Sequence, residues 1–199
     1  MQLYYSNTSP YARKTRLVLR EKGLESQIEE VLCNPFDPLP ALQRANPLHR
    51  VPTLVLPDGG ALFDSPVICQ YLDDLVPEPR LIPSNGPERW DCLRWEALAD
   101  GILDAAYNIV MERRRPETER SAHWLDAWER EIRAALTGAE QQRDRLPEEL
   151  RLSQLALGTA LGYLDFRLDD LGWRAACPVL NDWFREFAIR PTFQATQPV

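Results

Sequence analysis

Three short segments near the N-terminus combine helix starts with polar side chains that could hold a small ligand. In the first, Ser9 stands immediately before Pro10, the arrangement of a helix N-cap followed by the first helical residue. A helix start offers backbone N–H groups and about half a positive charge, so an anion beside Ser9 is stabilised. Ser9 is therefore a candidate either for simple capping or for holding an anionic group.

The second segment is Arg50-Val51-Pro52-Thr53. A proline that opens a strand removes one donor from the ladder. A cis Val51–Pro52 bond would leave the N–H and C=O of Val51 free to pair with an extended peptide. An ordinary trans proline at the first strand position is the alternative, and the spacing alone leaves both open.

The third segment, Asp64-Ser65-Pro66, is again typical of a helix start. The Ser65 hydroxyl and the free N–H groups suit a carboxylate, and Asp64 suits an ammonium group. A ligand with a free amino-acid end would meet both, although a capping pair without a ligand also explains the pattern. Together the three segments describe a site for a small peptide with an amino-acid end.

The elements that position these residues follow a β-α-β and then β-β-α order. Turn residues and apolar spacing predict strands and helices within the first 77 residues. The predicted strands cover residues 2–5, 25–32, 51–56 and 61–63, and the predicted helices cover 10–23 and 65–75, with one helical turn near Ala41.

Beyond residue 77 the sequence changes character. Four prolines and a glycine lie between Pro77 and Pro87 and indicate a linker. Helical spacing then predicts helices at 90–108, 117–145, 153–164 and 178–187. The third of these is apolar along almost its whole length and is predicted to be buried at the centre of an all-helical domain. We expect Ser153 to be its N-cap, without the reciprocal bond of a capping box because Ala156 stands at the third helical position.

The predicted organisation is thus an α/β N-terminal domain at 1–77, a linker at 78–86 and an all-α domain at 87–199. Three motifs of the first domain resemble those of glutathione S-transferases: the Ser-Pro-Tyr-Ala-Arg start at Ser9, the Asn46-Pro47 to Val51-Pro52 segment, and the Asp64-Ser65 segment that continues to Tyr71-Leu72. The tail from Trp183 to Pro191 is also similar to this family. The resemblance covers the whole chain and implies a thioredoxin-like N-terminal domain.

The resemblance also implies roles. Val51, through a cis bond to Pro52, is expected to hold the cysteinyl backbone of glutathione, and Asp64 and Ser65 its γ-glutamyl end. His49 and Arg50 replace the Gly-Lys or Gly-Gln pair that is usual before Val-Pro. Arg50 is preferred as the partner of the glycyl carboxylate because its charge is fixed.

Ser9 stands where members of the family place a catalytic serine or cysteine. A hydroxyl donor at a helix start can lower the pKa of a bound thiol, whereas no histidine is placed to make Ser9 a covalent nucleophile. Asn7 and Thr8 are alternative donors to the sulfur, and Tyr5 is expected to be a strand side chain. The walls of a second-substrate pocket are sought in Tyr11, Tyr107 and Met111, with Trp173 as a further candidate.

Composition narrows the function classes. The chain has 199 residues and a formal net charge of −7, from 30 acidic and 23 basic side chains, which disfavours nucleic acid and anionic membrane surfaces. No stretch is long and apolar enough to span a bilayer, and the first residues do not resemble a secretory signal. Two distant histidines and four scattered cysteines predict no metal site and a reduced, cytoplasmic setting; the cysteines are Cys33, Cys69, Cys92 and Cys177.

We therefore predict an enzyme that transfers glutathione to a small hydrophobic electrophile. A glutathione-dependent disulfide reductase or peroxidase would use the same site, and a partner-binding scaffold without chemistry is a further alternative. The resemblance implies a homodimer, in which Asp100 and Asp104 lie on a helix at the two-fold interface.

Overall fold

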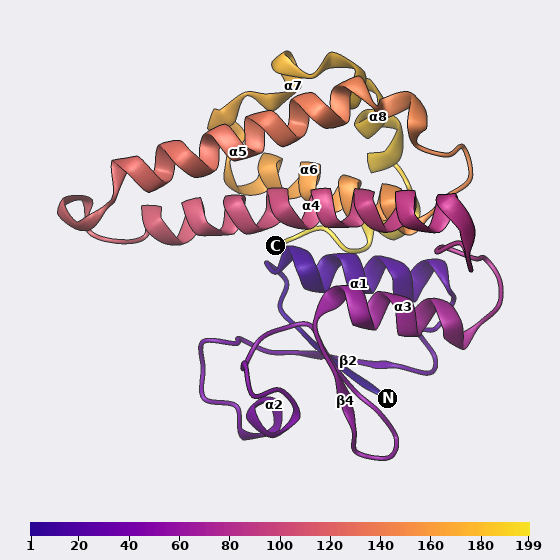
Figure 1. Cartoon of the computed structure of the whole chain (residues 1–199). Helices are drawn as coiled ribbons and strands as arrows, with labels where there is room; N and C mark the ends of the chain where they lie inside the picture. Colours follow the sequence, from indigo (N-terminus) through magenta and orange to yellow (C-terminus); the bar gives the residue numbers. More distant parts are fainter. The chain divides into compact units, whose positions relative to one another are not determined.

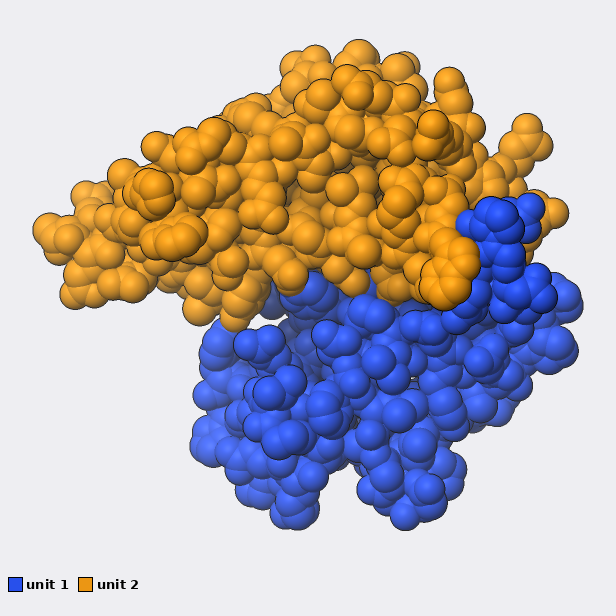
Figure 2. Space-filling view, viewed as in Figure 1, with its two compact units in different colours: residues 1–89, 191–199 blue, residues 90–190 orange.

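A computed structural model describes residues 1–199 and divides them into two compact units (Figure 2). Unit 1 comprises Met1–Arg89 and Pro191–Val199, and unit 2 comprises Trp90–Arg190. The sequence predicted a helical domain at 87–199, whereas residues 191–199 group with unit 1 in the structure. None of the helices combines the length and the apolar composition that crossing a bilayer requires.

Unit 1 is built on a small mixed sheet with helices (Figure 1). Its elements up to the linker are β1 (Gln2–Tyr5), α1 (Pro10–Glu21), β2 (Glu29–Leu32), α2 (Pro40–Ala45), β3 (Thr53–Val55), β4 (Ala61–Leu62) and α3 (Ser65–Leu75). The strands lie in the order β2-β1-β3-β4; β1 is parallel to β2 and antiparallel to β3, and β3 is antiparallel to β4. The predicted β-α-β and β-β-α order is confirmed.

The helices α1 and α3 pack against each other and provide the apolar core of unit 1 together with the sheet. Leu3 and Leu54 from the sheet, Leu17 from α1, and Ile68 and Leu72 from α3 have no exposed surface. Pro10 has a backbone conformation that suits the first turn of α1. Gly23 follows the C-cap of α1 and has a φ of 65°, which a glycine adopts without strain.

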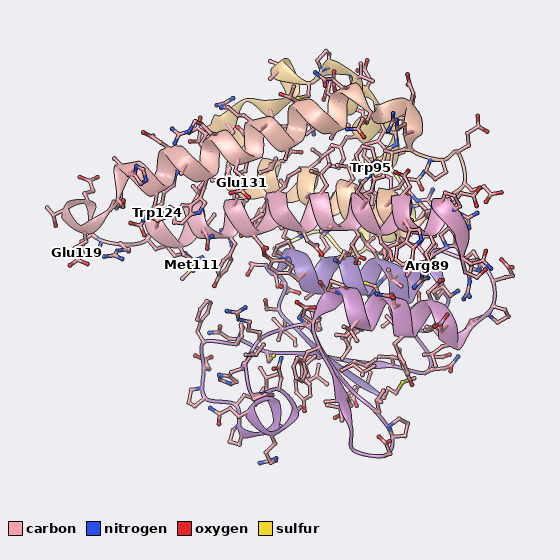
Figure 3. The ribbon with its side chains drawn as sticks, in the orientation of Figure 1. Arg89, Trp95, Met111, Glu119, Trp124 and Glu131 are labelled. Carbon is pink, nitrogen blue, oxygen red and sulfur yellow. The ribbon has the colours of Figure 1, made fainter.

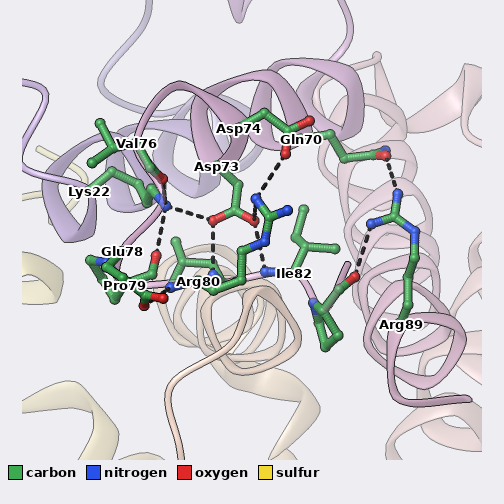
Figure 4. Close-up of polar contacts among 12 residues, drawn as sticks. Lys22, Gln70, Asp73, Asp74, Val76, Glu78, Pro79, Arg80, Ile82 and Arg89 are labelled. Atoms are coloured by element: carbon green, nitrogen blue, oxygen red, sulfur yellow. Dashed lines mark hydrogen bonds and ion pairs between the residues drawn. The ribbon is translucent and has the colours of Figure 1, made fainter. Parts of the chain in front are cut away.

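A buried ion pair fixes the segment that follows α3 (Figure 4). The ammonium group of Lys22 lies 2.9 Å from Asp73 Oδ1 and donates to the carbonyl oxygens of Val76 and Pro79. Asp73 in turn accepts from the backbone N–H groups of Leu81 and Ile82. These hydrogen bonds offset the cost of burying the charges of Lys22 and Asp73. They also fix the backbone of residues 76–82.

The tail of the chain packs on α1. It contains α9 (Pro191–Gln194), which contacts α1. Arg13 Nη2 donates to the carbonyl oxygen of Phe193 at 3.1 Å, and its guanidinium lies 3.8 Å from the centre of the Phe193 ring. Thr192 also donates a hydrogen bond to Glu21.

Unit 2 is all-helical. Its elements are α4 (Gly86–Arg113, which begins in unit 1), η1 (Glu117–Glu119), α5 (Ala122–Gln141), η2 (Arg143–Arg145), α6 (Leu152–Arg167), η3 (Asp169–Leu171), α7 (Trp173–Ala176) and α8 (Pro178–Ala188). Twelve of the sixteen residues of α6 are buried, as its apolar sequence predicted.

Two predicted helix starts in unit 2 were wrong. The helix expected at 117–145 is interrupted, because Ser121 caps α5 by accepting from the N–H of Trp124, and short 3-10 turns flank α5 on both sides. The third helix starts earlier than expected: Ser153 lies inside α6 and is buried, and the N-cap is Arg151. Gln154, at the third helical position, accepts from the N–H of Arg151, so the reciprocal bond exists but is made by a different pair than the one predicted.

Candidate functional site

Three loops of unit 1 meet at one end of its sheet, where β1 and β4 end and β3 begins; this end is called an edge below. The register pairs Tyr4 with Thr53 and Leu54 with Leu62. β1 therefore runs toward this edge, β3 starts from it and β4 runs toward it. The segments that follow β1, precede β3 and follow β4 contain Ser9, Val51-Pro52 and Asp64-Ser65. The structure thus gathers the three predicted segments at one place.

Ser9 is the N-cap of α1, and its Oγ accepts from the N–H of Ala12 at 3.2 Å. The side chain is half-buried. Capping uses an oxygen lone pair and leaves the hydroxyl proton available to a second acceptor. The capping and ligand-holding roles that the sequence left as alternatives are therefore compatible with each other.

The charge of α1 favours an anion at its start. The first turn has no acidic residue, and the helix contains three buried cations, Arg13, Lys14 and Arg16. Burial, together with the nearby charge of Arg16, lowers the pKa of Arg13 to about 10, so Arg13 still carries its charge at neutral pH. Arg16 is paired with Glu30, so the charge of Arg13 and the helix dipole, which is positive at this end, contribute most to the field at Ser9.

The Val51–Pro52 peptide bond is cis. No backbone hydrogen bond within the chain uses the N–H or the C=O of Val51. Its side chain is buried against Tyr4 and Leu42. Val51 is thus anchored by its side chain while its backbone groups remain available to an extended ligand.

Asn46 holds this loop, a role that sequence reasoning missed. Its amide nitrogen donates to the Arg50 carbonyl at 3.2 Å and to Thr53 Oγ1 at 2.9 Å, and its amide oxygen accepts from the N–H of Leu48. Thr53 Oγ1 donates to the same Arg50 carbonyl at 2.8 Å. The only sequence signal was the Asn46-Pro47 dipeptide, because a buried amide cannot be recognised from spacing alone.

His49 and Arg50 differ in their surroundings. His49 has a φ of 54°, rare for a residue other than glycine, and its Nε2 is buried without a hydrogen-bond partner. Arg50 is exposed, and no carboxylate of the chain pairs with it. Arg50 is therefore free to meet an external anion, whereas His49 is held by the backbone of the loop.

Asp64 is the N-cap residue of α3 and Ser65 its first residue. Asp64 is exposed and makes no capping bond, and Ser65 is only 1% exposed. No hydrogen bond or ion pair within the chain uses either side chain. Both remain available for a ligand with an ammonium and a carboxylate group.

The candidates for a second-substrate pocket fall in different units. Tyr11 lies on α1 in unit 1, and Tyr107 and Met111 lie on α4 in unit 2. Trp173 is not a wall of a pocket but part of the core of unit 2: it is 2% exposed, donates to Asp165 at 2.9 Å and packs edge-on against Phe184.

None of the four cysteines forms a disulfide, and three of them have altered acidity. Burial raises the pKa of the thiols of Cys33, Cys92 and Cys177, which makes them poor nucleophiles. No group of three or more His, Cys, Asp or Glu side chains is arranged to hold a metal ion.

Comparisons with known proteins show the family to which the chain belongs. Residues 8–75 match the family model described as glutathione S-transferase, N-terminal domain. The chain is 32% identical to the uncharacterized GST-like protein YibF of Escherichia coli K12, over 100% of this chain and 98% of the relative. A glutathione transferase family member of Pseudomonas fluorescens Pf-5 with bound glutathione is 37% identical and has a TM-score of 0.96, covering 100% of this chain and 98% of that one.

A further structure from the same strain contains S-(propanoic acid)-glutathione; it is 35% identical with a TM-score of 0.92, and the alignment covers 100% of both chains. These full-length similarities establish that the chain belongs to the glutathione S-transferase family.

Proposed function

We propose that this chain is a glutathione transferase that binds glutathione at the edge of the unit 1 sheet and stabilises its thiolate with Ser9. The observation that supports this most strongly is the Ser9 hydroxyl, which caps α1 as an acceptor and keeps its proton for a sulfur. The glutathione bound to the relative from P. fluorescens supports the choice of ligand.

Each part of glutathione has a complementary group. The backbone of Val51, which no bond within the chain uses, pairs with the cysteinyl residue. Asp64 and Ser65 receive the ammonium and carboxylate of the γ-glutamyl end at the start of α3. The guanidinium of Arg50 receives the glycyl carboxylate.

The chemistry depends on the pKa of the bound thiol. A free thiol is ionised to only a few per cent at pH 7. Each unit by which the site lowers its pKa requires about 1.4 kcal/mol of differential stabilisation. The hydroxyl of Ser9 and the positive field of α1 act in this direction. The thiolate then attacks an electrophilic carbon: a C–S bond forms, and the leaving group departs with its electron pair.

Calorimetric titration of reduced glutathione into the purified protein tests the site directly. We expect saturable binding in the micromolar to low millimolar range, about 4–8 kcal/mol. A folded protein that gives no binding heat and no saturation would remove the basis of the proposal and favour the scaffold alternative.

Ser9→Ala tests the role of the hydroxyl. We expect the pKa of bound glutathione to rise by about one unit or more, with kcat/KM falling about tenfold or more below that pKa. Thiolate absorbance as a function of pH measures the first quantity, and conjugation kinetics the second. Thr8→Ala is the matched control and should leave both unchanged; unchanged turnover in Ser9→Ala instead points to Asn7 or Thr8.

Two substrates separate conjugation from disulfide chemistry. With an aryl halide, the thiolate displaces halide and forms a thioether. With a small disulfide, it forms a mixed disulfide and releases a thiol, and a second glutathione completes the reduction. The S-substituted glutathione bound in the relative supports conjugation, so we expect faster turnover of the aryl halide.

We also propose that the protein is a cytoplasmic homodimer, with Asp100 and Asp104 on α4 at the two-fold interface. Four cysteines that form no disulfide are typical of a protein from a reducing compartment, which supports this location. Light scattering coupled to gel filtration measures the oligomeric state, and a monomer mass at working concentration would exclude the dimer.

A further inference from the structure

The C-terminal tail of unit 1 covers a cation of α1 that stands one helical turn after Ser9. The N–H of Arg13 donates to the carbonyl oxygen of Ser9 at 3.0 Å, which places Arg13 in the turn that the N-cap opens. Residues four apart lie on the same side of a helix. Arg13 is 5% exposed, so its charge is buried close to the candidate sulfur site.

Phe193 holds the guanidinium of Arg13 with its backbone and with its ring. Arg13 Nη2 donates to the carbonyl oxygen of Phe193 at 3.1 Å, and the guanidinium carbon lies 3.8 Å from the centre of the ring. Arg13 Nε is buried without a hydrogen-bond partner, and no ion pair within the chain neutralises the guanidinium. The charge of Arg13 is therefore held by neutral groups.

A second contact attaches the tail at the other end of α1. The hydroxyl of Thr192 donates to Glu21 Oε1 at 2.5 Å, and Glu21 is the last residue of α1. The short helix α9 packs on α1 between these points. Phe193 thus belongs to a segment that is fixed to α1 at two residues eight positions apart.

The other charged residues of α1 have partners. Arg16 and Arg20 both pair with Glu30 on β2. Lys14 also has a partner. On the tail, the residues on both sides of Phe193 are neutral, so no carboxylate from α9 compensates the charge of Arg13.

Packing alone does not explain a cation at this position. An apolar side chain under the Phe193 ring would avoid the cost of burying a charge that has no carboxylate partner. A buried charge, however, acts over a longer distance than a hydrated one, because the surrounding protein and the absence of salt screen it less. The Phe193 ring excludes water from the guanidinium face and so preserves this effect.

We propose that Phe193 positions the charge of Arg13 and keeps it dehydrated, and that the tail thereby favours the anionic form of the glutathione sulfur at Ser9. Phe193 is a positioning residue, since it acts through Arg13. This inference rests on the proposed function and adds a second determinant of thiolate formation. The contribution of the tail requires no contact with glutathione.

The pKa of bound glutathione, measured from thiolate absorbance as a function of pH, tests the inference on the full chain. We expect Arg13→Gln to raise this pKa by about 0.5–1 unit. Phe193→Leu should raise it by about half as much, because leucine keeps the buried apolar packing but leaves the guanidinium face open to water. Arg13→Lys keeps the charge and should restore most of the difference.

The pH profile of conjugation gives an independent measurement. In Arg13→Gln, kcat/KM should fall about three- to tenfold at pH values below the pKa of the bound thiol and approach the wild-type value above it. A purely structural role of Arg13 or Phe193 predicts the same loss at every pH.

Two control variants separate the position of a charge from the net charge of the chain. Arg20→Gln removes the same charge about two turns farther along α1, where Glu30 already compensates it. Glu131→Gln changes the net charge by one unit at an exposed position on α5 in unit 2 (Figure 3). Both should leave the pKa of bound glutathione within about 0.2 unit of the wild-type value.

S-methylglutathione, which has no ionisable thiol, distinguishes this inference from the proposed function. Its affinity should be the same in wild type, Arg13→Gln and Phe193→Leu, and circular dichroism establishes that each variant is folded. Failure of the wild type to bind S-methylglutathione or glutathione overturns the proposed function and this inference with it. Normal binding with an unshifted thiol pKa in both variants overturns this inference alone. An Arg13→Lys variant as impaired as Arg13→Gln would show that charge is not the cause.

Discussion

Thr53 holds the loop of residues 46–53, which presents Val51 in the proposed glutathione site. Its hydroxyl accepts from Asn46 and donates to the Arg50 carbonyl. Thr53→Val keeps the shape but removes both bonds, so we expect the free energy of unfolding to fall by about 1–3 kcal/mol. Glutathione affinity should also fall, because the backbone of Val51 is presented by this loop.

Urea denaturation and glutathione titration measure the two effects of Thr53→Val. Thr137→Val is the matched control, since Thr137 is exposed on α5 and donates only to a carbonyl of its own helix. Equal effects of the two substitutions on glutathione affinity would contradict the role assigned to Thr53.

Glu30 provides a pH-dependent contact between β2 and α1. Burial would raise the pKa of Glu30, but the hydrogen bonds and charges of Arg20 and Arg16 outweigh burial and hold the pKa below its ordinary value. A carboxylate with a depressed folded-state pKa stabilises the protein above its unfolded pKa, and this contribution is lost as the pH falls through the folded pKa.

We expect Glu30→Gln to lower the free energy of unfolding by about 1–2 kcal/mol at neutral pH. The difference from wild type should shrink as the pH falls below about 4.3, the ordinary value for glutamate. Urea denaturation at a series of pH values measures this difference in the free energy of unfolding, with Glu25→Gln at an exposed position as the control. A difference that stays constant down to acid pH would show that charge is not the cause.

Sequence patterns located the residues at helix starts but not those that depend on tertiary contacts. Ser9, Asp64 and Ser65 were identified because a capping residue followed by proline is a recognisable signal of a helix start. The φ of His49 was not predictable, since the tertiary fold imposes it on a residue that rarely adopts it. The Asn46–Thr53 contact likewise requires the loop to be folded first.

At the scale of elements, α6 allows a sharp test of packing. A Cβ atom on Gly158 would lie 2.2 Å from Cε1 of Phe187 on α8. Alanine in a helix is favoured over glycine by up to about 1 kcal/mol, yet overpacking costs about 1–3 kcal/mol. We therefore expect Gly158→Ala to lower the free energy of unfolding.

Gly138→Ala on α5 is the matched control, because nothing lies within 4 Å of the added Cβ. It should raise the free energy of unfolding by about 0.5–1 kcal/mol. Thermal and urea denaturation measure both variants. Stabilisation by Gly158→Ala would mean that Phe187 moves aside at little cost.

Element types were predictable from periodicity, whereas several boundaries were not. The apolar pattern at 153–164 predicted a buried helix, and α6 is one. The start of α5 could not be predicted from the pattern at 117–145, because the polar residues at Glu117–Glu119 are compatible with a 3-10 turn as well as with an α-helix. The short helices α7 and α9 have too few residues to show a period.

At the scale of the whole molecule, the tail is part of the N-terminal unit. Phe193 is 3% exposed and lies under the guanidinium of Arg13. We expect Phe193→Ala to lower the free energy of unfolding by about 3–5 kcal/mol, the cost of removing a buried aromatic ring. The exposed Val199→Ala should change it by less than about 0.5 kcal/mol.

Denaturation curves of the two tail variants, followed by fluorescence and circular dichroism, measure this difference. A small effect of Phe193→Ala would show that the tail adds little to unit 1. The sequence could not predict the return of the tail, since its family-like motif gives no indication of which unit it joins.

The return of residues 191–199 to unit 1 has a consequence for synthesis. About 100 residues separate Arg89 from Pro191, and ribosomes add roughly 5–20 residues per second. The N-terminal unit therefore waits about 5–20 s, after its own first 89 residues are made, for the segment that completes it. During that interval the guanidinium of Arg13 lacks the Phe193 carbonyl and ring. Synthesis of unit 1 thus starts before that of unit 2 and is completed after it.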